Sequence, residues 1–215
     1  QWIIIFHIFI INAIIIRKLY KSRFYLNKSD KLKEIYDKII QMAISKGATS
    51  AKIIPIEDIS VNDWVRQKCE FGCTQYGKKY TCPPYVQSPE ETRKRLKEYR
   101  KAMIVKFGEI KDRMEWRGIQ KLMAELEREA FLSGLYKAFA YGAGTCKLCD
   151  DCSNDQVQTP SLFDKRRCVY RRIARPSMEG VGIDVFQTAK NAGYDLKVVP
   201  KEDMCFTSFC LLLLE

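Results

Sequence analysis

Residues 102–107 are Ala102-Met103-Ile104-Val105-Lys106-Phe107, a short apolar run that is typical of a buried strand. The sequence that follows predicts a long helix from about Asp112 to Lys137. Residues 138–141 are a further short strand candidate, and they lead directly into a group of cysteines. A strand, a helix and a strand in succession indicate an α/β domain.

The same alternation continues on both sides of this stretch. Before it, the sequence predicts a helix from Ser29-Asp30 to Gly47, a strand at 51–56, a short amphipathic turn at 63–66, and a helix that starts at the capping box Ser88-Pro89-Glu90-Glu91 and ends near Arg100. After it come a helix capped by Ser177 that ends near Gly193, and strands at 196–199 and 206–214. The pattern predicts an α/β fold in one globular domain: a mixed sheet with flanking helices and two cysteine-rich metal-binding loops.

The composition is that of a folded chain in which histidine chemistry has little place. The 215 residues are 47% hydrophobic and 12% aromatic, which excludes a disordered chain. The formal net charge is +11, but no basic stripe interleaved with aromatic residues is present, so we expect no nucleic-acid partner. His7 is the one histidine and lies in an apolar run, which argues against a His-Cys or Ser-His catalytic pair. We therefore expect the cysteines to carry the chemistry.

The first 28 residues differ from the rest of the chain. Residues 2–16 are almost wholly apolar, but as a helix they would span only about 22 Å, short of a bilayer crossing. If this segment is a membrane anchor, the basic residues after it place the metal domain on the cytoplasmic side. The alternative is translated sequence upstream of the true start. We therefore divide the chain into an apolar and basic segment, 1–28, and a cytoplasmic cysteine-rich metal-binding domain, 29–215.

The nine cysteines are clustered rather than spread along the chain. Because we recognise no secretory signal, we interpret close-set thiols as metal ligands rather than disulfides. The cysteines are Cys69, Cys73, Cys82, Cys146, Cys149, Cys152, Cys168, Cys205 and Cys210. We expect the first seven to bind metal.

Cys146, Cys149 and Cys152 have the spacing C-x2-C-x2-C, and Cys168 follows sixteen positions later. This is the triple of bacterial ferredoxins, in which each thiolate bonds a different iron of a cubane cluster. Zinc sites usually pair two distant C-x2-C motifs, because four ligands must converge on one atom. The spacing predicts an iron–sulfur cluster, [4Fe–4S], held by Cys146, Cys149, Cys152 and Cys168, with zinc as the alternative.

Cys69, Cys73 and Cys82 form a second group with the spacing C-x3-C-x8-C, which differs from the C-x3-C-x2-C of radical-SAM enzymes. Three thiolates leave one iron of a cubane for a substrate, solvent or a ligand other than cysteine. Cys205 or Cys210 would complete this site if either reached it, but both lie in an apolar terminal segment typical of a core. The sequence thus predicts one or two clusters.

Charged residues near the cysteines indicate further roles. The basic residues that surround Cys168 would raise the potential of a cluster or dock an acidic partner. Four residues are candidates for charge stabilisation and proton transfer if the protein is an enzyme: Arg66, Lys78, Arg175 and Glu179. Glu127 and Glu129 diverge by about 200° on a helix, so we do not expect them to form an acid–base pair.

Several motifs occur together and in a fixed order. They are Val65-Arg66, Cys69-x3-Cys73, Tyr76-Gly77, Cys82-Pro83-Pro84, Gly144, Cys146-x2-Cys149-x2-Cys152, Arg175-Pro176-Ser177-Met178-Glu179 and Gly182-Ile183-Asp184-Val185. Over roughly residues 30–214 the chain thereby resembles the prokaryotic predicted metal-binding proteins called domain of unknown function 2284. The resemblance implies a cysteine-bound metal centre in a bacterial or archaeal cytosolic protein, and it brings no assigned reaction.

Three functions remain open on this basis. The first is electron transfer to a redox partner protein by one or two [4Fe–4S] clusters. The second is an enzyme whose three-cysteine cluster acts on an unidentified small molecule, as a Lewis acid or redox centre at its open iron. The third is a zinc-stabilised interaction module.

Overall fold

The structure is a computed structural model that describes residues 28–152, 165–197 and 206–215. The chain divides into two compact units, residues 1–38 and 39–215, with the boundary inside helix α2 (Lys28–Ser45). Within the described ranges, no helix has the length and apolar character needed to cross a membrane. The apolar segment 2–16, interpreted above as a membrane anchor or a misread start, lies outside the described residues.

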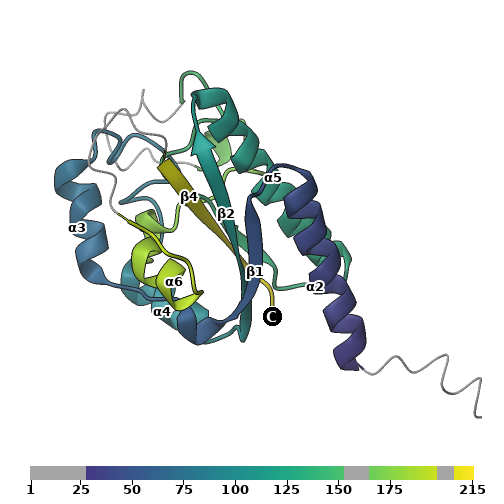
Figure 1. Cartoon of the computed structure of the whole chain (residues 1–215). Coiled ribbons are helices and arrows are strands. Elements are labelled where there is room, and N and C mark those ends of the chain that lie inside the picture. Colours follow the sequence, from purple (N-terminus) through teal and green to yellow (C-terminus); the bar gives the residue numbers. More distant parts are fainter. Residues whose placement is uncertain (1–27, 153–164, 198–205) are drawn as a thin grey trace, which may run out of the picture. The chain divides into compact units, whose positions relative to one another are not determined.

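A four-stranded sheet forms the centre of the second unit (Figure 1). Its strands are β1 (Ser50–Pro55), β2 (Lys101–Ile110), β3 (Phe139–Tyr141) and β4 (Phe206–Leu213). The spatial order is β1-β2-β4-β3, so the last strand of the chain lies between two earlier ones. All three strand pairs are antiparallel, and the isolated bridge between Gly142 and Ser177 is parallel. The predicted α/β class is confirmed, but the described strands form an antiparallel sheet rather than the predicted mixed sheet.

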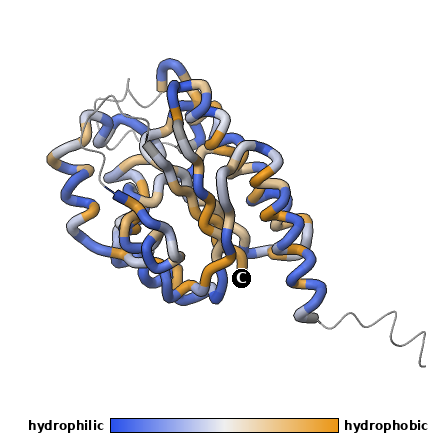
Figure 2. The backbone as a smooth tube through the Cα atoms, in the orientation of Figure 1, coloured by the Kyte–Doolittle hydropathy of each residue, from blue (hydrophilic) through white to orange (hydrophobic). Residues whose placement is uncertain are grey.

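Both faces of the central strands β2 and β4 are buried, by side chains that alternate along each strand. Ala102 and Ile104 of β2 pair with Leu213 and Leu211 of β4 on one face, which belongs to a core cluster with Ile183. The alternate pairs, such as Met103 with Leu212, are also fully buried, and helix α5 packs against β3 and β4. Figure 2 shows orange, hydrophobic stretches along these central strands. A strand buried on both faces is apolar at successive positions, as residues 102–105 are.

Five α-helices occur in the described residues. They are α2, α3 (Asp63–Gly72), α4 (Pro89–Leu96), α5 (Arg113–Leu132) and α6 (Val185–Asn191), and short 3₁₀ helices lie at Ile56–Asp58, Lys165–Arg167 and Glu179–Val181. The predicted capping box is confirmed, since the hydroxyl of Ser88 accepts from the N–H of Glu91 and the Glu91 carboxylate accepts from the N–H of Ser88. The turn predicted at 63–66 is the start of the longer helix α3, which carries Cys69.

The helix predicted from Ser177 to Gly193 is wrong in its first half. The first half of this stretch contains only a single 3₁₀ turn, Glu179–Val181, which ends at Gly182 with φ +85°. A Cβ on Gly182 would lie 2.7 Å from Cγ of Pro89, so close packing against α4 holds the backbone in a left-handed conformation. Asp184, not Ser177, caps the true helix α6 by accepting from the N–H of Gln187.

The strand predicted at 196–199 is also wrong where it can be observed. Leu196 and Lys197 belong to no strand, and they line a pocket instead. Residues 198 and 199 lie outside the described residues.

Candidate metal centres and the adjoining pocket

Four cysteines from two distant segments line one small cavity. Cys146, Cys149 and Cys152 approach it from the segment after β3, and Cys168 comes from the segment after the 3₁₀ helix at 165–167. Residues Lys79–Thr81 complete much of the remaining wall. The eight cysteines in the described part of the chain are all free thiols. The structure thus brings together the four thiols that the spacing assigned to one cluster.

Backbone amides point at two of these sulfur atoms. The N–H of Leu148 donates to Cys146, and the N–H of Tyr170 donates to Cys168. These bonds lower the thiol pKa values, but burial acts more strongly and raises the pKa of Cys146, Cys149 and Cys168. Protonated thiols must lose their protons to bind metal, so a metal would be needed to hold them as thiolates.

Helix α5 holds the loop that carries Cys146, Cys149 and Cys152. Arg117 donates to the carbonyl of Lys147 at 2.9 Å and to the carboxylate of Asp150 at 2.9 Å. Gln120 accepts from the N–H of Lys147 at 2.8 Å, and Arg113 donates to the carbonyl of Cys149. Because positions 113, 117 and 120 share one helix face, a polar stripe on α5 fixes the loop. Our sequence analysis missed this stripe, although its spacing alone could have revealed it.

The second cysteine group lies around the end of helix α3. Cys69 is in the helix, Cys73 is its C-terminal capping residue, and Cys82 is buried in the turn that follows. Burial and, to a smaller extent, the nearby thiols of Cys73, Cys146 and Cys69 raise the pKa of Cys82 to about 12. Cys82 therefore interacts with both groups.

The turn before Cys82 makes the two groups neighbours. Residues Lys79–Thr81 form a wall of the four-cysteine cavity, and Cys82 follows them directly. In the part of the chain that the structure describes, no three Cys, His, Asp or Glu side chains already form a group able to hold one metal ion.

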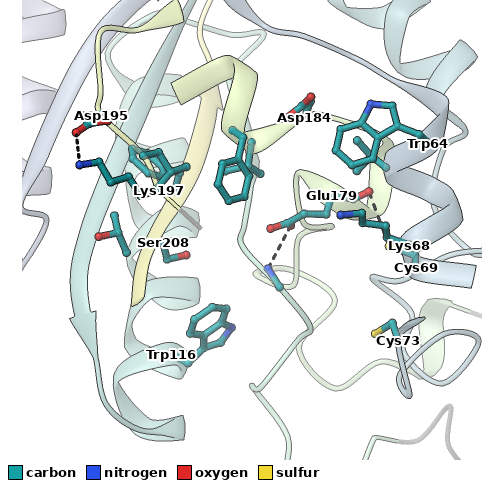
Figure 3. A pocket seen from close by; sticks show the side chains of 17 residues that line it. Trp64, Lys68, Cys69, Cys73, Trp116, Glu179, Asp184, Asp195, Lys197 and Ser208 are labelled. Atoms are coloured by element: carbon teal, nitrogen blue, oxygen red, sulfur yellow. Dashed lines mark hydrogen bonds and ion pairs between the residues drawn. The ribbon is translucent and has the colours of Figure 1, made fainter. Parts of the chain in front are cut away.

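Cys69 and Cys73 line a pocket of about 740 Å³ (Figure 3). Its apolar lining includes the aromatic side chains of Trp64, Trp116 and Phe186. The structure therefore sets the second cysteine group beside a space large enough for a small molecule.

The carboxyl group of Glu179 belongs to the same pocket. It accepts from the N–H of Gly144 at 3.4 Å, and the backbone carbonyl of Glu179 lies 4.0 Å from the sulfur of Cys69. Burial raises the pKa of Glu179, and the N–H of Gly144 partly offsets this effect. Of the four predicted enzyme candidates, Glu179 is the one that lines this pocket.

The other three candidates lie elsewhere. Arg66 donates to the carbonyls of Gln87 and Gly180 at 3.1 Å each. Burial raises the pKa of Cys69, and the charge of Arg66 offsets part of this effect. Lys78 is exposed in the turn before Cys82 and lines none of the cavities described. The two arginine bonds tie the turn after Cys82 to the segment that carries Glu179.

Arg175 forms a bidentate ion pair with Glu127 of α5. Its Nε and Nη2 donate to the two carboxylate oxygens at 2.7 and 2.5 Å, and both side chains are less than one-fifth exposed. Glu127 also accepts from the N–H of Ala140 in β3 at 2.8 Å. This geometry gives Arg175 a structural role, because it anchors the segment before Glu179 to the sheet.

The fully buried Cys210 lies in β4, as expected for a core residue, and Cys205 lies outside the described residues.

The family model of the predicted metal-binding proteins, DUF2284, matches residues 52–214. The chain belongs to this family. The match includes both cysteine groups and Glu179 of the DUF2284 protein, and it confirms the resemblance drawn from the motifs. Among curated proteins and among solved structures, nothing matches.

Proposed function

We propose that this DUF2284 protein carries a [4Fe–4S] cluster on Cys146, Cys149, Cys152 and Cys168 and transfers electrons to a partner protein. The observation that carries the proposal is that these four thiols, from two segments, line one cavity. The ferredoxin-like spacing of the first three supports it. When bound, such a cluster stores one electron and releases it to an acceptor.

The surroundings of the cavity fit an anionic cluster. Amide N–H groups that point at the sulfurs, here those of Leu148 and Tyr170, stabilise thiolate charge. Burial raises the pKa of Cys168, and the positive charge of Arg171 offsets part of this effect. The chain's own residues therefore hold the ligands in place and offset part of their charge.

The surface beside Cys168 is suited to docking an acidic partner protein. Arg167, Arg171 and Arg172 are exposed, and the side chain of Val169 between them is 76% exposed. Basic side chains around an apolar contact attract an acidic protein and orient it by electrostatic complementarity. A docked partner would then be next to the four-cysteine cavity.

A second candidate function is chemistry on a small molecule at the group Cys69, Cys73 and Cys82. The specific observation is that Cys69 and Cys73 line the 740 Å³ pocket together with Glu179. In this function the three thiols would hold a cluster with one iron not bound by cysteine, Arg66 would offset thiolate charge, and Glu179 would exchange a proton with the bound molecule. Zinc in place of iron would remove both candidate functions.

The test is reduction and reoxidation of the full-length protein purified without oxygen. Dithionite should reduce the cluster, which lowers the absorbance at about 400 nm and produces an electron paramagnetic resonance signal of about one spin per four iron atoms. An acidic one-electron acceptor should then reoxidise the protein, more slowly as ionic strength rises.

Arg171→Glu supplies the variant for the docking surface. It should slow reoxidation by the acidic acceptor several-fold at low salt. Arg128→Glu is the matched control, because Arg128 is exposed on α5 and makes the same change in net charge. Equal slowing in both variants would contradict a docking surface beside Cys168, and a protein that dithionite cannot reduce would contradict electron transfer.

A further inference from the structure

Aromatic side chains from several elements line the pocket beside Cys69. Trp64 of α3 and Phe186 of α6 are 45% and 42% exposed, and both line the pocket with Trp116 of α5. Its volume of about 740 Å³ is within the range of small-molecule sites. Partly exposed aromatic rings around a cavity of this size are typical of a site that stacks on a planar ligand.

The position of Trp116 depends on a glycine. Gly144 has φ +54°, and a Cβ at this residue would lie 2.6 Å from the indole ring of Trp116. The ring can therefore lie against the backbone only because residue 144 has no side chain. The N–H of Gly144 also donates to Glu179, so this one residue positions both the indole ring of Trp116 and the carboxyl group of Glu179 in the pocket.

The carboxyl groups of the pocket have partners within the protein. Asp184 accepts from the N–H of Gln187 and from the side chain of Asn62. Asp195 pairs with Lys197 at 3.6 Å, and Glu179 accepts from Gly144 as described above.

Lys68 is different from these groups. Within the described ranges its Nζ has no acidic partner, and it lies 5.1 Å from the centre of the Trp64 ring. Figure 3 shows Lys68 on the α3 side of the pocket, opposite Lys197 and Ser208. A positive charge next to an aromatic wall favours a ligand with a negative group at that end.

We propose that this pocket binds a small planar aromatic molecule that carries an acidic group. The ring packs against Trp64 and Phe186, and the acidic group faces Lys68. Because Cys69 and Cys73 lie in the same wall, the bound molecule is next to the second cysteine group. The inference does not depend on which metal the protein binds.

Four probes test it by ligand-observed nuclear magnetic resonance titration of the full-length protein. They are 2-naphthoate, the saturated decahydro-2-naphthoate, neutral 2-naphthylmethanol and cationic 2-naphthylmethylammonium. We expect 2-naphthoate to bind about threefold to tenfold more tightly than the saturated acid, because only a planar ring stacks. It should also bind more tightly than the cationic probe.

Matched variants assign the binding to this pocket. Phe186→Ala should weaken 2-naphthoate about threefold to tenfold, whereas Phe131→Ala, on an exposed phenylalanine outside the pocket, should leave it unchanged. Lys68→Gln should weaken 2-naphthoate about twofold to fivefold and leave 2-naphthylmethanol unchanged. Circular dichroism checks that each variant folds. If Phe186→Ala does not fold, Phe186→Leu is used in its place.

Three results would overturn the inference: no binding of 2-naphthoate, equal binding to wild type and Phe186→Ala, or a cationic probe that binds as tightly as the anionic one. Iron and zinc are measured on the same samples. Loss of probe binding with normal metal content rejects the pocket alone, and probe binding without iron rejects the proposed function alone.

Discussion

The two cysteine groups are neighbours with different surroundings. The four thiols of Cys146, Cys149, Cys152 and Cys168 line a small cavity, and α5 holds the loop that carries three of them. Cys69 and Cys73 instead lie in the wall of a pocket of about 740 Å³. A complete thiol set in a small cavity suits storage of an electron, whereas an incomplete set beside a pocket suits contact with a small molecule. The spacing of cysteines indicates ligands but not what surrounds them.

The largest expected effect separates the two groups as metal sites. Cys146→Ser should remove the metal of the four-cysteine group and Cys82→Ser that of the three-cysteine group, so each variant loses about half of the iron if both sites bind cubanes. Iron analysis of anaerobically purified variants measures this. If either variant loses all of its iron, the two groups form a single centre and the comparison fails.

The next effect concerns the ion pair that anchors the segment before Glu179. Arg175→Met leaves the buried Glu127 carboxylate without its bidentate partner, and we expect a loss of about 2–4 kcal/mol in the free energy of unfolding. Denaturant unfolding of the full chain measures it. Lys94→Met, which breaks an exposed pair with Glu90, is the control and should have no measurable effect. Equal unfolding free energies for the two variants would show that Arg175 does not anchor its segment.

A smaller effect is expected at the segment that borders the pocket. Gly182→Ala forces a Cβ to within 2.7 Å of Pro89 at φ +85°, which should cost about 1–3 kcal/mol of stability. Gly72→Ala has no heavy atom within 4 Å of its new Cβ and should be neutral or slightly stabilising at the end of α3. Thermal unfolding compares the two. Equal melting temperatures would contradict the close contact between Gly182 and Pro89.

The smallest effect tests the helix stripe that holds the cysteine loop. Arg117→Met removes hydrogen bonds to the Lys147 carbonyl and Asp150, and we expect metal to leave the four-cysteine group about tenfold faster in the presence of a chelator. The Cys146→Ser background supplies the control, because it retains the other site alone. An Arg117→Met change that speeds metal loss in that background too would contradict a role confined to this loop.

Local patterns predicted the elements that depend on local interactions. The capping box at Ser88 is set by residues three apart, and the strand is apolar over 102–105 because both of its faces are buried there. The grouping of Cys146, Cys149 and Cys152 follows from their spacing in the same way. Cys168 is the exception, since a distance of sixteen residues does not by itself bring it to the cavity.

Non-local contacts produced what the sequence could not predict. The position of β4 between β2 and β3 pairs it with residues about 100 positions earlier in β2 and about 70 positions earlier in β3, and no local pattern encodes that order. The end of the 3₁₀ turn at Gly182 depends on contact with Pro89, and the pocket wall depends on Trp116 against Gly144. The helix predicted from Ser177 fails because Pro89, against which Gly182 packs, is far from it in the sequence.

Analysis of iron, zinc and acid-labile sulfide per chain tests the central claim most directly. The sample is wild-type protein purified without oxygen, and its absorbance spectrum is recorded at the same time. We predict about eight iron and eight sulfide per chain if both groups bind cubanes, or about four of each if only the four-cysteine group does, with a broad band near about 400 nm. Stoichiometric zinc without sulfide would contradict the account and leave a structural metal site.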